Sequence, residues 1–394
     1  MEVVSTESKQ AVGVVYVIGT LLVGGTERQL VELIKGLDRS RFTPFVCCIF
    51  GSGVLQEELE TIGVEVKVFS FVGTTGGGLS SKVLVRNIKA FFSLVAYLKK
   101  LKPAVLHSNL KLNNLFGATA AKFARIPYII VGYRNIIDET EKYPFLLWWE
   151  RKVNSWADTI VTNSQAVRYA VKQRLNPSLN KIRVIHNGID IAQFKKKKNT
   201  QLVIGNISLP ITEPVITVVA NLIPYKGHED LIRAINIVCQ KNANIKCILV
   251  GRDDGFGIHL RELVWKLNLQ DKIIFAGALF NIPDILALTD IQVLASYHEG
   301  FSNVILEGMA AGIPQVVTDV GGNAEAVVDG ETGFVVPPKN PEALAGAILR
   351  LLEDEELRKK MGQAGQSRVE KYFSLERMIR ETEQIYTELL CSSP

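Results

Sequence analysis

Two glutamates, Glu299 and Glu307, are the residues whose type and spacing best fit a chemical role in this 394-residue chain. A carboxylate accepts two hydrogen bonds at once, so each glutamate suits neighbouring hydroxyls of a ribose or a hexose. Residues 291–294 are typical of a buried strand and residues 303–311 of a helix, with Ser302 as its N-cap. Amides at the start of that helix suit a phosphate, and they belong to Gly300, Phe301, Ser302 and Asn303. Two surface glutamates on an ordinary helix are the plainer interpretation.

Lys226 is the cation best placed to work on a diphosphate, because it follows a predicted strand at residues 215–220 and precedes Gly227. The departure of a nucleoside diphosphate builds up negative charge, which a fixed cation stabilises in the transition state. Asn221 lies in the same loop, where its amide can donate a neutral hydrogen bond, and Arg252 follows another predicted strand. A solvated lysine before a helix and an ordinary loop arginine are the alternatives.

Polar side chains also follow predicted strands in the first half of the chain. His107 and Asn109 come after a strand at residues 104–106, and Arg134 and Asn135 come after one at residues 128–133. Histidine can exchange a proton near neutral pH, whereas a neutral asparagine can orient a hydroxyl but cannot act as a base. A buried, hydrogen-bonded histidine and a structural arginine remain alternatives.

The elements that must position these residues form two similar series. Residues 12–19 are an apolar strand that meets the glycine turn Gly24-Gly25 and then a helical pattern over residues 26–37. Residues 215–220 lead in the same way into a helix at residues 228–239. Apolar strands alternating with helices predict two α/β domains, each a Rossmann-like, doubly wound parallel sheet. Further strands are expected at residues 45–50, 64–69, 104–107, 128–133, 159–162, 246–250, 273–276, 291–294, 315–317 and 333–336.

The predicted boundaries give three segments: a first Rossmann-like domain at residues 1–190, a second at residues 191–375, and a C-terminal helix at residues 376–394 that packs back on the first domain. The hinge is placed near Asn187-Gly188, where a tight turn is permitted. Ligands of such sheets bind at the carboxyl ends of the strands. The polar residues named above all fall near that edge, so the sequence predicts one functional site there.

The first residues lack a basic segment followed by an apolar core, and no apolar run has the roughly 18 residues that cross a bilayer. The five cysteines form no CxxC pair, so neither a disulfide framework nor a zinc site is indicated. The adjacent acids Asp253-Asp254 are expected to be loop residues rather than metal ligands. These features predict a cytoplasmic protein.

Charge is distributed unevenly along the chain. Residues 1–200 contain 28 Lys/Arg and 15 Asp/Glu, a net charge of +13, whereas the remainder carries −8. A basic first half could attract anionic lipid head groups or an anionic acceptor, and a solvated surface is the alternative. Residues 82–102 and 143–149 combine aromatic or aliphatic side chains with nearby lysines, as peripheral membrane helices do. The cations are dispersed and no nucleic-acid motif is present, so nucleic acid is not an expected partner.

The string from Glu299 to Glu307 resembles the E-x7-E motif of the retaining glycosyltransferases of family 4, whose fold is GT-B. The resemblance continues through residues 312–325 and 329–337 and extends back to Asn187-Gly188, Lys226-Gly227 and Gly24-Gly25. It implies two domains that face a cleft, an acceptor-binding domain at residues 1–190 and a nucleotide-sugar-binding domain at residues 191–375. It also implies transfer of a sugar from a nucleotide diphosphate donor, UDP or GDP, without a metal or other cofactor. Glu299 would hold hydroxyls of the donor sugar, Glu307 the ribose and Lys226 the diphosphate, and the glycine turn would approach the reacting centre.

Two positions depart from the family's pattern. The usual arginine after the strand at residues 215–220 is replaced by Asn221, for which Arg252 is a possible substitute. The usual second histidine of a His-x-His is Asn109, and only His107 matches. A front-face retaining reaction needs no strong enzyme base, because the departing phosphate oxygen can take the proton. We therefore expect a glycosyltransferase of cell-surface polysaccharide or glycolipid synthesis, acting on a carbohydrate or lipid-linked acceptor. A catalytically impaired sugar-nucleotide-binding protein and a nucleotide-sugar epimerase of the same fold are the alternatives.

Overall fold

The computed structural model describes residues 11–72, 81–135, 143–195, 201–204, 207–210, 212–241, 244–279 and 281–392. The chain divides into two compact units, Met1–His186 with Met378–Pro394 and Asn187–Arg377. We call them unit 1 and unit 2 and describe each by itself. The N-terminal residues on which the prediction about a signal segment rests, 1–10, lie outside the described residues. Among the described helices, none combines the length and the apolar content that crossing a bilayer requires.

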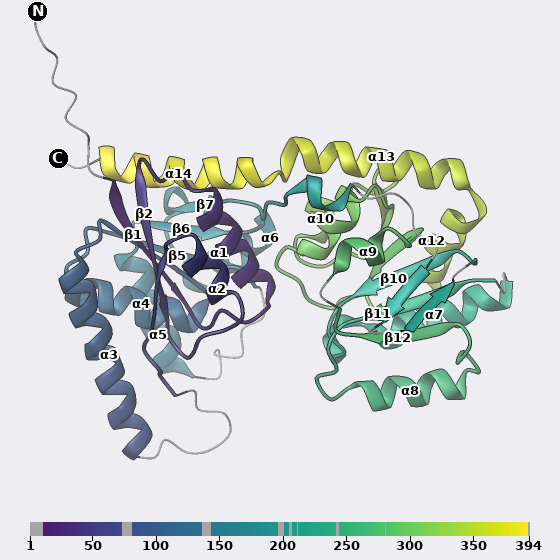
Figure 1. Cartoon of the computed structure of the whole chain (residues 1–394), viewed down its shortest axis with the longest axis horizontal. Coiled ribbons are helices and arrows are strands. Elements are labelled where there is room, and N and C mark those ends of the chain that lie inside the picture. Colours follow the sequence, from purple (N-terminus) through teal and green to yellow (C-terminus); the bar gives the residue numbers. More distant parts are fainter. Residues whose placement is uncertain are drawn as a thin grey trace, which may run out of the picture. The chain divides into compact units, whose positions relative to one another are not determined.

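Unit 1 is built on a seven-stranded parallel sheet with the order β3-β2-β1-β4-β5-β6-β7 (Figure 1). Its central strands are buried on both faces, as continuous apolar runs require, and Val14, Val15, Val17 and Ile18 of β1 are fully buried. The strands are β1 (Val12–Ile18), β2 (Phe42–Cys48), β3 (Glu65–Val68), β4 (Val105–Asn109), β5 (Tyr128–Tyr133), β6 (Thr159–Thr162) and β7 (Ile182–Val184).

Helices connect these strands, and the last helix of the chain, α14 (Leu375–Cys391), joins the same unit from residue 378 onward. Asp38 donates its backbone N–H to Glu383 on α14 at 2.7 Å, and Arg41 donates to Thr387 at 2.6 Å. Gly36 has no side chain to collide with Ile379, so α14 packs closely against the end of α1. The other helices of unit 1 are α1 (Gly25–Gly36), α2 (Gln56–Thr61), α3 (Ser81–Leu101), α4 (Lys111–Ala124), α5 (Pro144–Trp156) and α6 (Gln165–Leu175).

Unit 2 repeats the design with a six-stranded parallel sheet in the order β12-β11-β10-β13-β14-β15. Its strands are β10 (Val215–Val219), β11 (Lys246–Val250), β12 (Ile273–Gly277), β13 (Ile291–Leu294), β14 (Gln315–Thr318) and β15 (Gly333–Val336). Its α-helices are α7 (His228–Lys241), α8 (Gly257–Lys266), α9 (Ile282–Leu286), α10 (Asn303–Ala310), α11 (Asn323–Ala326), α12 (Pro341–Glu353) and α13 (Glu355–Tyr372).

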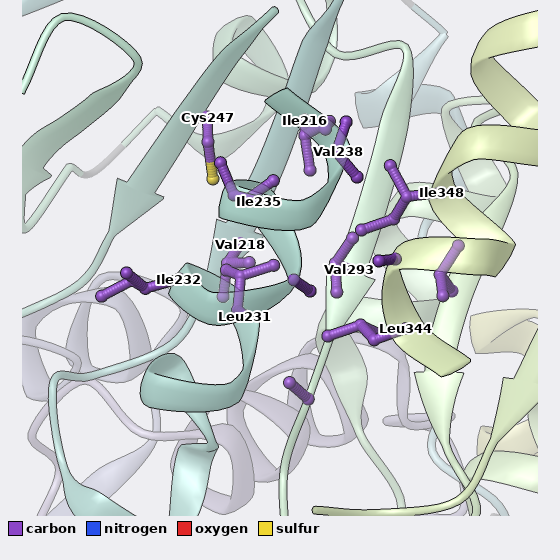
Figure 2. Close-up of a cluster of buried hydrophobic side chains, with 14 of the residues drawn as sticks. Ile216, Val218, Leu231, Ile232, Ile235, Val238, Cys247, Val293, Leu344 and Ile348 are labelled. Carbon is purple, nitrogen blue, oxygen red and sulfur yellow. The ribbon is translucent and has the colours of Figure 1, made fainter. Parts of the chain in front are cut away.

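The core of unit 2 lies between the sheet and the helices α7 and α12. Figure 2 shows their side chains turned toward Val293 of β13, with Ile235 and Val238 coming from α7 and Leu344 and Ile348 from α12. All of these side chains are almost completely buried. Removal of this apolar area from water is the main stabilising contribution to the unit, at about 25 cal/mol per Å².

The predicted fold class, two Rossmann-like parallel sheets, is confirmed. Several predicted strands have the observed bounds, among them β5, β6, β11, β13 and β15. The predicted end of β4 is wrong. The strand continues through Asn109, because Asn109 pairs with Gly132 of β5 in the parallel ladder. No strand is predicted at residues 201–210, where β8 (Gln201–Ile204) and β9 (Ile207–Pro210) form an antiparallel pair.

Candidate active site

In unit 2 the two most prominent predicted residues are in direct contact. Lys226 donates to Oε1 of Glu299 with an Nζ–Oε1 distance of 2.6 Å. Ser296 donates to the same oxygen at 2.7 Å. The side chains of Lys226 and Glu299 are 19% and 11% exposed, so both groups are partly shielded and still reachable. Since Oε1 accepts both bonds, Oε2 of Glu299 is the oxygen left to accept from a ligand hydroxyl.

Adjacent strands bring this pair together. Lys226 ends a short 3₁₀ turn (Pro224–Lys226) after β10, and Glu299 lies in the loop after β13, the neighbour of β10 in the sheet. The backbone N–H of Tyr297 donates to the carbonyl of Tyr225 at 2.7 Å and ties the two loops together. Gly227 has a φ of +68°, and a β-carbon there would overlap the carbonyl oxygen of Ala295. The glycine after Lys226 is therefore needed for the close approach of the two loops.

A third loop, after β14, supports Glu299 from another side. Gly321 has a φ of +55°, and a β-carbon at this position would overlap the carbonyl oxygen of Glu299. The N–H of Gly322 donates to the carbonyl of Gly300 at 2.9 Å. Gly321, Gly322 and Ser296 were not among the predicted site residues. A Gly-Gly pair directly after a predicted strand was the signal that could have identified this loop.

The start of α10 lies just beyond Glu299, and its residues differ in what they can offer a ligand. Ser302 is the N-cap residue by position, as predicted, but its side chain makes no capping hydrogen bond. Phe301 is 5% exposed and its ring packs on Phe373 at 5.3 Å, so the ring belongs to the core of unit 2. Asn187 donates to the carbonyl of Phe301 at 3.1 Å and to the side-chain oxygen of Asn303 at 2.7 Å.

Glu307 lies in the second turn of α10 and is partly buried, which fits the predicted spacing of one loop acid and one helical acid. Because α10 begins at Asn303, Glu299 precedes the helix start in sequence and Glu307 follows it. The N-terminal end of a helix carries a partial positive charge, which favours a negatively charged group near it.

Asn221 and Arg252 form a separate cluster. Asn221 donates to Asp254 at 3.2 Å, and the Arg252 guanidinium donates to both oxygens of Asp254 at 2.6 and 3.1 Å. These hydrogen bonds lower the pKa of Asp254 and raise that of Arg252. Asp253 accepts backbone N–H groups of Gly255 and Gly257 and thereby shapes the loop. Among the hydrogen bonds and ion pairs of the described residues, none joins this cluster to the Lys226–Glu299 pair.

In unit 1 the structure joins two predicted residues, Asn109 and Arg134. The Nε of Arg134 donates to Oδ1 of Asn109 at 3.1 Å. Gly132, opposite Asn109 in the sheet, makes room for that side chain, since a β-carbon would overlap Oδ1. Burial lowers the pKa of Arg134 to about 10, against the opposing effect of Glu27. Asn135 follows Arg134 and is exposed.

The glycine turn of unit 1 is followed by an acid, Glu27, whose charge interacts with that of Arg134. Gly24 is the N-cap of α1, and the Glu27 carboxylate folds back over it, where a β-carbon would overlap the carboxylate. Burial raises the pKa of Glu27, and the charge of Arg134 lowers it. Glu27 therefore belongs with Gly24, Gly25 and Arg134, although it was not a predicted site residue. The pairing of an acid with Arg134 could not be inferred from positions more than a hundred residues apart.

His107 is 2% exposed and lies on β4 beside Tyr16 of β1. Its Nδ1 is 2.8 Å from the hydroxyl of Tyr386 on α14. Burial lowers the pKa of His107 to about 3, so the imidazole is neutral at physiological pH. His107 and Asn109 are two residues apart on one strand and therefore lie on the same face of the sheet. The described residues contain no group of three or more His, Cys, Asp or Glu side chains placed to hold a metal ion.

Two family models match consecutive parts of the chain. The model of "Glycosyltransferase Family 4" matches residues 23–193, and that of "Glycosyl transferases group 1" matches residues 193–368. The chain belongs to the group 1, family 4 glycosyltransferases. The matched regions contain every predicted site residue of both units, from Gly24 to Glu307.

Curated relatives of this glycosyltransferase share about the same level of identity. N-acetyl-alpha-D-glucosaminyl L-malate synthase of Bacillus anthracis is 30% identical over 59% of this chain and 60% of its own length. The Staphylococcus aureus capsular polysaccharide biosynthesis glycosyltransferase CapM is 28% identical over 79% of this chain and 83% of its own. The Escherichia coli UDP-Gal:alpha-D-GlcNAc-diphosphoundecaprenol alpha-1,3-galactosyltransferase is 24% identical over 94% of this chain and 95% of its own.

A solved structure supports the fold. Anabaena Alr3699/HepE in complex with UDP-glucose superimposes with a TM-score of 0.81 at 22% identity, over 96% of this chain and all of the other. The fold is therefore GT-B, with one Rossmann-like domain in each unit.

Proposed function

We propose that this glycosyltransferase moves a sugar with retention of configuration from a UDP- or GDP-sugar to a carbohydrate or lipid-linked acceptor. The contact of Lys226 with Glu299 beside the start of α10 carries the proposal. A cation for the diphosphate, a carboxylate for the sugar and helix amides for a phosphate are thereby gathered at one edge of one sheet.

In the proposed reaction the bond between the sugar carbon and the diphosphate oxygen breaks, and a bond to the acceptor oxygen forms on the same face. The acceptor's hydroxyl proton passes to the departing phosphate oxygen, so no strong enzyme base is required. Lys226 stabilises the charge that develops on the diphosphate, and Glu299 Oε2 orients the sugar. Neither step requires a metal, and we propose that the enzyme is metal-independent.

A donor panel tests this function. The protein is incubated with UDP-, GDP- and ADP-sugars and with GlcNAc-diphosphoundecaprenol, the acceptor named for the E. coli relative, and released nucleoside diphosphate is measured. Turnover with at least one donor, resistance to EDTA and an unchanged anomeric configuration in the product are expected. Thermal stabilisation by a nucleotide without turnover would indicate a binding protein, and donor conversion without acceptor would indicate an epimerase.

Substitution of Glu299 identifies the site responsible. Glu299→Ala should abolish turnover, because the sugar and Lys226 both lose their partner. Glu370→Ala is the matched control, since Glu370 also pairs with a lysine of unit 2, Lys195, at 3.0 Å but on the surface. Equal activity of the two variants would count against the proposed donor site.

We further propose that unit 1 contacts an anionic membrane surface where a lipid-linked acceptor is held. The helices α3, α4 and α5 lie side by side and share ring contacts, including Phe91 with Phe123 at 5.8 Å and Phe116 with Trp149 at 5.5 Å. We call their exposed aromatic rings and basic side chains the aromatic–basic face. Its exposed rings are Phe92, Phe123, Phe145 and Trp148, each more than half exposed, and its exposed basic residues are Lys82, Arg86, Lys89, Lys122, Arg151 and Lys152.

Charge favours anionic lipid as the partner of this face. Helices α3 and α4 contain no acidic residue, and the single acid of α5 is Glu150. Glu150 is fully buried and pairs with Lys111 at 3.0 Å and with Arg174. The three helices therefore present cations and rings to solvent without an exposed acid, which is the composition of helices that lie in a lipid interface.

Vesicle sedimentation tests the membrane proposal. The protein should bind vesicles of phosphatidylcholine with phosphatidylglycerol, bind weakly to phosphatidylcholine alone, and dissociate at high salt. The double variant Phe145→Ser, Trp148→Ser should bind less. The control Ile258→Ser, Trp265→Ser changes two apolar residues of α8 in unit 2 that are more exposed than Phe145 and Trp148, and it should bind like the unaltered protein. Loss of binding in the control alone would overturn the assignment to unit 1.

A further inference from the structure

Tyr386 is a fully buried tyrosine of α14 whose hydroxyl meets two other polar groups in the core of unit 1. It donates to the hydroxyl of Tyr16 on β1 at 3.0 Å and lies 2.8 Å from Nδ1 of His107 on β4. The Tyr386 ring also packs edge-on against Phe42 at 5.5 Å. Three polar side chains are thus joined in an apolar interior, and α14 supplies the central one.

A hydroxyl has a single hydrogen, and this determines which groups donate and which accept in the series of hydrogen bonds that joins Tyr16, Tyr386 and His107. Because the hydrogen of Tyr386 is directed to Tyr16, its oxygen must accept in the bond with His107, and Nδ1 of His107 must carry the hydrogen. A neutral imidazole has one N–H, so Nε2 of His107 is left with a lone pair. Nε2 is buried and has no hydrogen-bond partner among the described residues.

An unsatisfied acceptor in a protein interior costs free energy unless a ligand or solvent group completes it. Nε2 belongs to a residue on the same face of β4 as Asn109, whose side chain accepts from Arg134. Under the proposed function this face is the acceptor half of the site. A hydroxyl of a bound sugar is a group that can donate to Nε2 there.

We propose that Tyr386 is a positioning residue for the transfer reaction, on the assumption that the proposed function holds. Its hydroxyl keeps His107 in the tautomer protonated at Nδ1, so that Nε2 accepts a hydrogen bond from a substrate hydroxyl. The C-terminal helix thereby contributes to the acceptor half of the site without touching substrate. The anchoring of α14 by Glu383 and Thr387, three residues before and one after Tyr386, fixes the height of the hydroxyl above the sheet.

The tautomer can be measured directly, without turnover. Ring ¹⁵N NMR of the unaltered protein should show His107 protonated at Nδ1 between pH 6 and 8, with the signal assigned by its loss in His107→Gln. Tyr386→Phe, which keeps the ring contact with Phe42, should shift His107 toward a mixture of tautomers. Protonation at Nε2 in the unaltered protein, or an unchanged spectrum in Tyr386→Phe, would overturn the proposal even if the enzyme is a transferase.

Kinetics separate positioning from structural support. Tyr386→Phe should lower kcat about tenfold, equivalent to about 1.4 kcal/mol, with little change in KM for the donor. In a His107→Ala background the same substitution should have no further effect on kcat, because its influence passes through His107. Tyr97→Phe is the control, since Tyr97 also donates to a fixed group in unit 1, Glu65, at 2.9 Å.

The kinetic outcomes are also decisive. A tenfold loss that persists in the His107→Ala background would assign Tyr386 a purely structural role. If no donor supports turnover at all, the proposed function fails, and the NMR measurement still decides whether Tyr386 sets the tautomer.

Discussion

At the scale of single residues, Lys226 and Glu299 form one ion pair. The sequence analysis assigns them separate roles, with the diphosphate bound by Lys226 and the donor sugar by Glu299. Oε1 of Glu299 accepts from both Lys226 and Ser296, so the carboxylate holds the ammonium group in place before any donor arrives. A preorganised cation has little further reorganisation to undergo when the diphosphate develops charge. Under the proposed function, the ion pair also keeps Glu299 oriented toward the donor sugar. Loss of either partner should therefore affect the chemical step more than donor affinity.

Lys226→Met tests this preorganisation at the lysine. It keeps most of the length of the side chain and removes the charge, so kcat should fall about 10²- to 10³-fold, as for other lost transition-state contacts. Steady-state kinetics with the donor found by the panel provide the measurement. The control Lys195→Met removes the lysine of the exposed pair with Glu370 and should change kcat less than twofold, in line with the small contribution of surface ion pairs. A fall in kcat of the same size in both variants would contradict the role of Lys226.

Residue type and local order were enough to predict Glu299, Lys226 and the start of α10, because each follows a strand that its apolar run makes evident. Contacts across the sheet were not predictable in this way. The hydrogen bond between Arg134 and Asn109 depends on the absence of a side chain at Gly132. The hydrogen bond that Ser296 donates to Glu299 depends on the path of a loop. Glu27 and Tyr386 were missed because their partners are distant in sequence and became neighbours only through the fold.

At the scale of elements, the carboxyl-end loops of neighbouring strands hold the proposed donor site in unit 2 through backbone contacts. Gly227 lies over the carbonyl of Ala295, and Gly321 lies over the carbonyl of Glu299. Both glycines have a positive φ, which other residues adopt only at a cost of about 1–2 kcal/mol. The loops are thus packed backbone to backbone, and a single added carbon must push one of them away.

Gly321→Ala should therefore destabilise unit 2 and raise KM for the donor, because the loop carrying Glu299 must move. The free energy of unfolding should fall by at least about 1–2 kcal/mol from backbone strain alone. Gly346→Ala provides the contrast, since no atom lies within 4 Å of an added β-carbon there. Gly346 is in the middle of α12, so alanine should stabilise the helix by about 0.5–1 kcal/mol. Thermal unfolding and donor KM of both variants are the measurements.

Strands and helices were predictable wherever an apolar run had a clear period, and their ends were less so. The strand β4 ends two residues later than expected because ladder pairing with β5, a tertiary effect, includes polar Ser108 and Asn109. The pair β8 and β9 was missed because its short strands lie in a segment beside a polar, lysine-rich stretch. That lysine run, residues 196–198, itself lies outside the described residues.

At the scale of the whole molecule, the two units share one design and differ in charge and in what they offer to ligands. Unit 2 presents acids and a lysine beside a helix start, and unit 1 presents neutral polar groups, a partly buried arginine and the aromatic–basic face. Under the proposed function, the basic first half binds the acceptor and the acidic second half binds the donor. Each unit has its own buried core, and each also contains one buried histidine, His107 in unit 1 and His228 in unit 2.

These histidines should make the molecule sensitive to acid. Burial lowers the pKa of His107 to about 3 and that of His228 to about 4, from an ordinary value of 6.5. The charges of Arg134 near His107 and of Lys226 near His228 act in the same direction, while Tyr16 and Tyr386 face His107 as neutral hydroxyls. Between about pH 4 and 6.5 the unfolded chain binds protons that the folded units do not. Stability is therefore retained above pH 6.5 and is lost as the pH falls.

The slope of that loss is a measurable quantity. Each buried histidine should contribute up to about 1.4 kcal/mol per pH unit to the decrease in unfolding free energy between pH 6.5 and 4. Calorimetry over this range should follow the transitions of both units, since a two-domain chain need not unfold in one step. His228→Gln should reduce the slope for unit 2 and leave that for unit 1 unchanged, because His107 is not altered. His298→Gln changes an exposed histidine of unit 2 and should leave both slopes as they are. If His228→Gln behaves like His298→Gln, then His228 takes up its proton in the folded state, and its burial does not account for the acid sensitivity of unit 2.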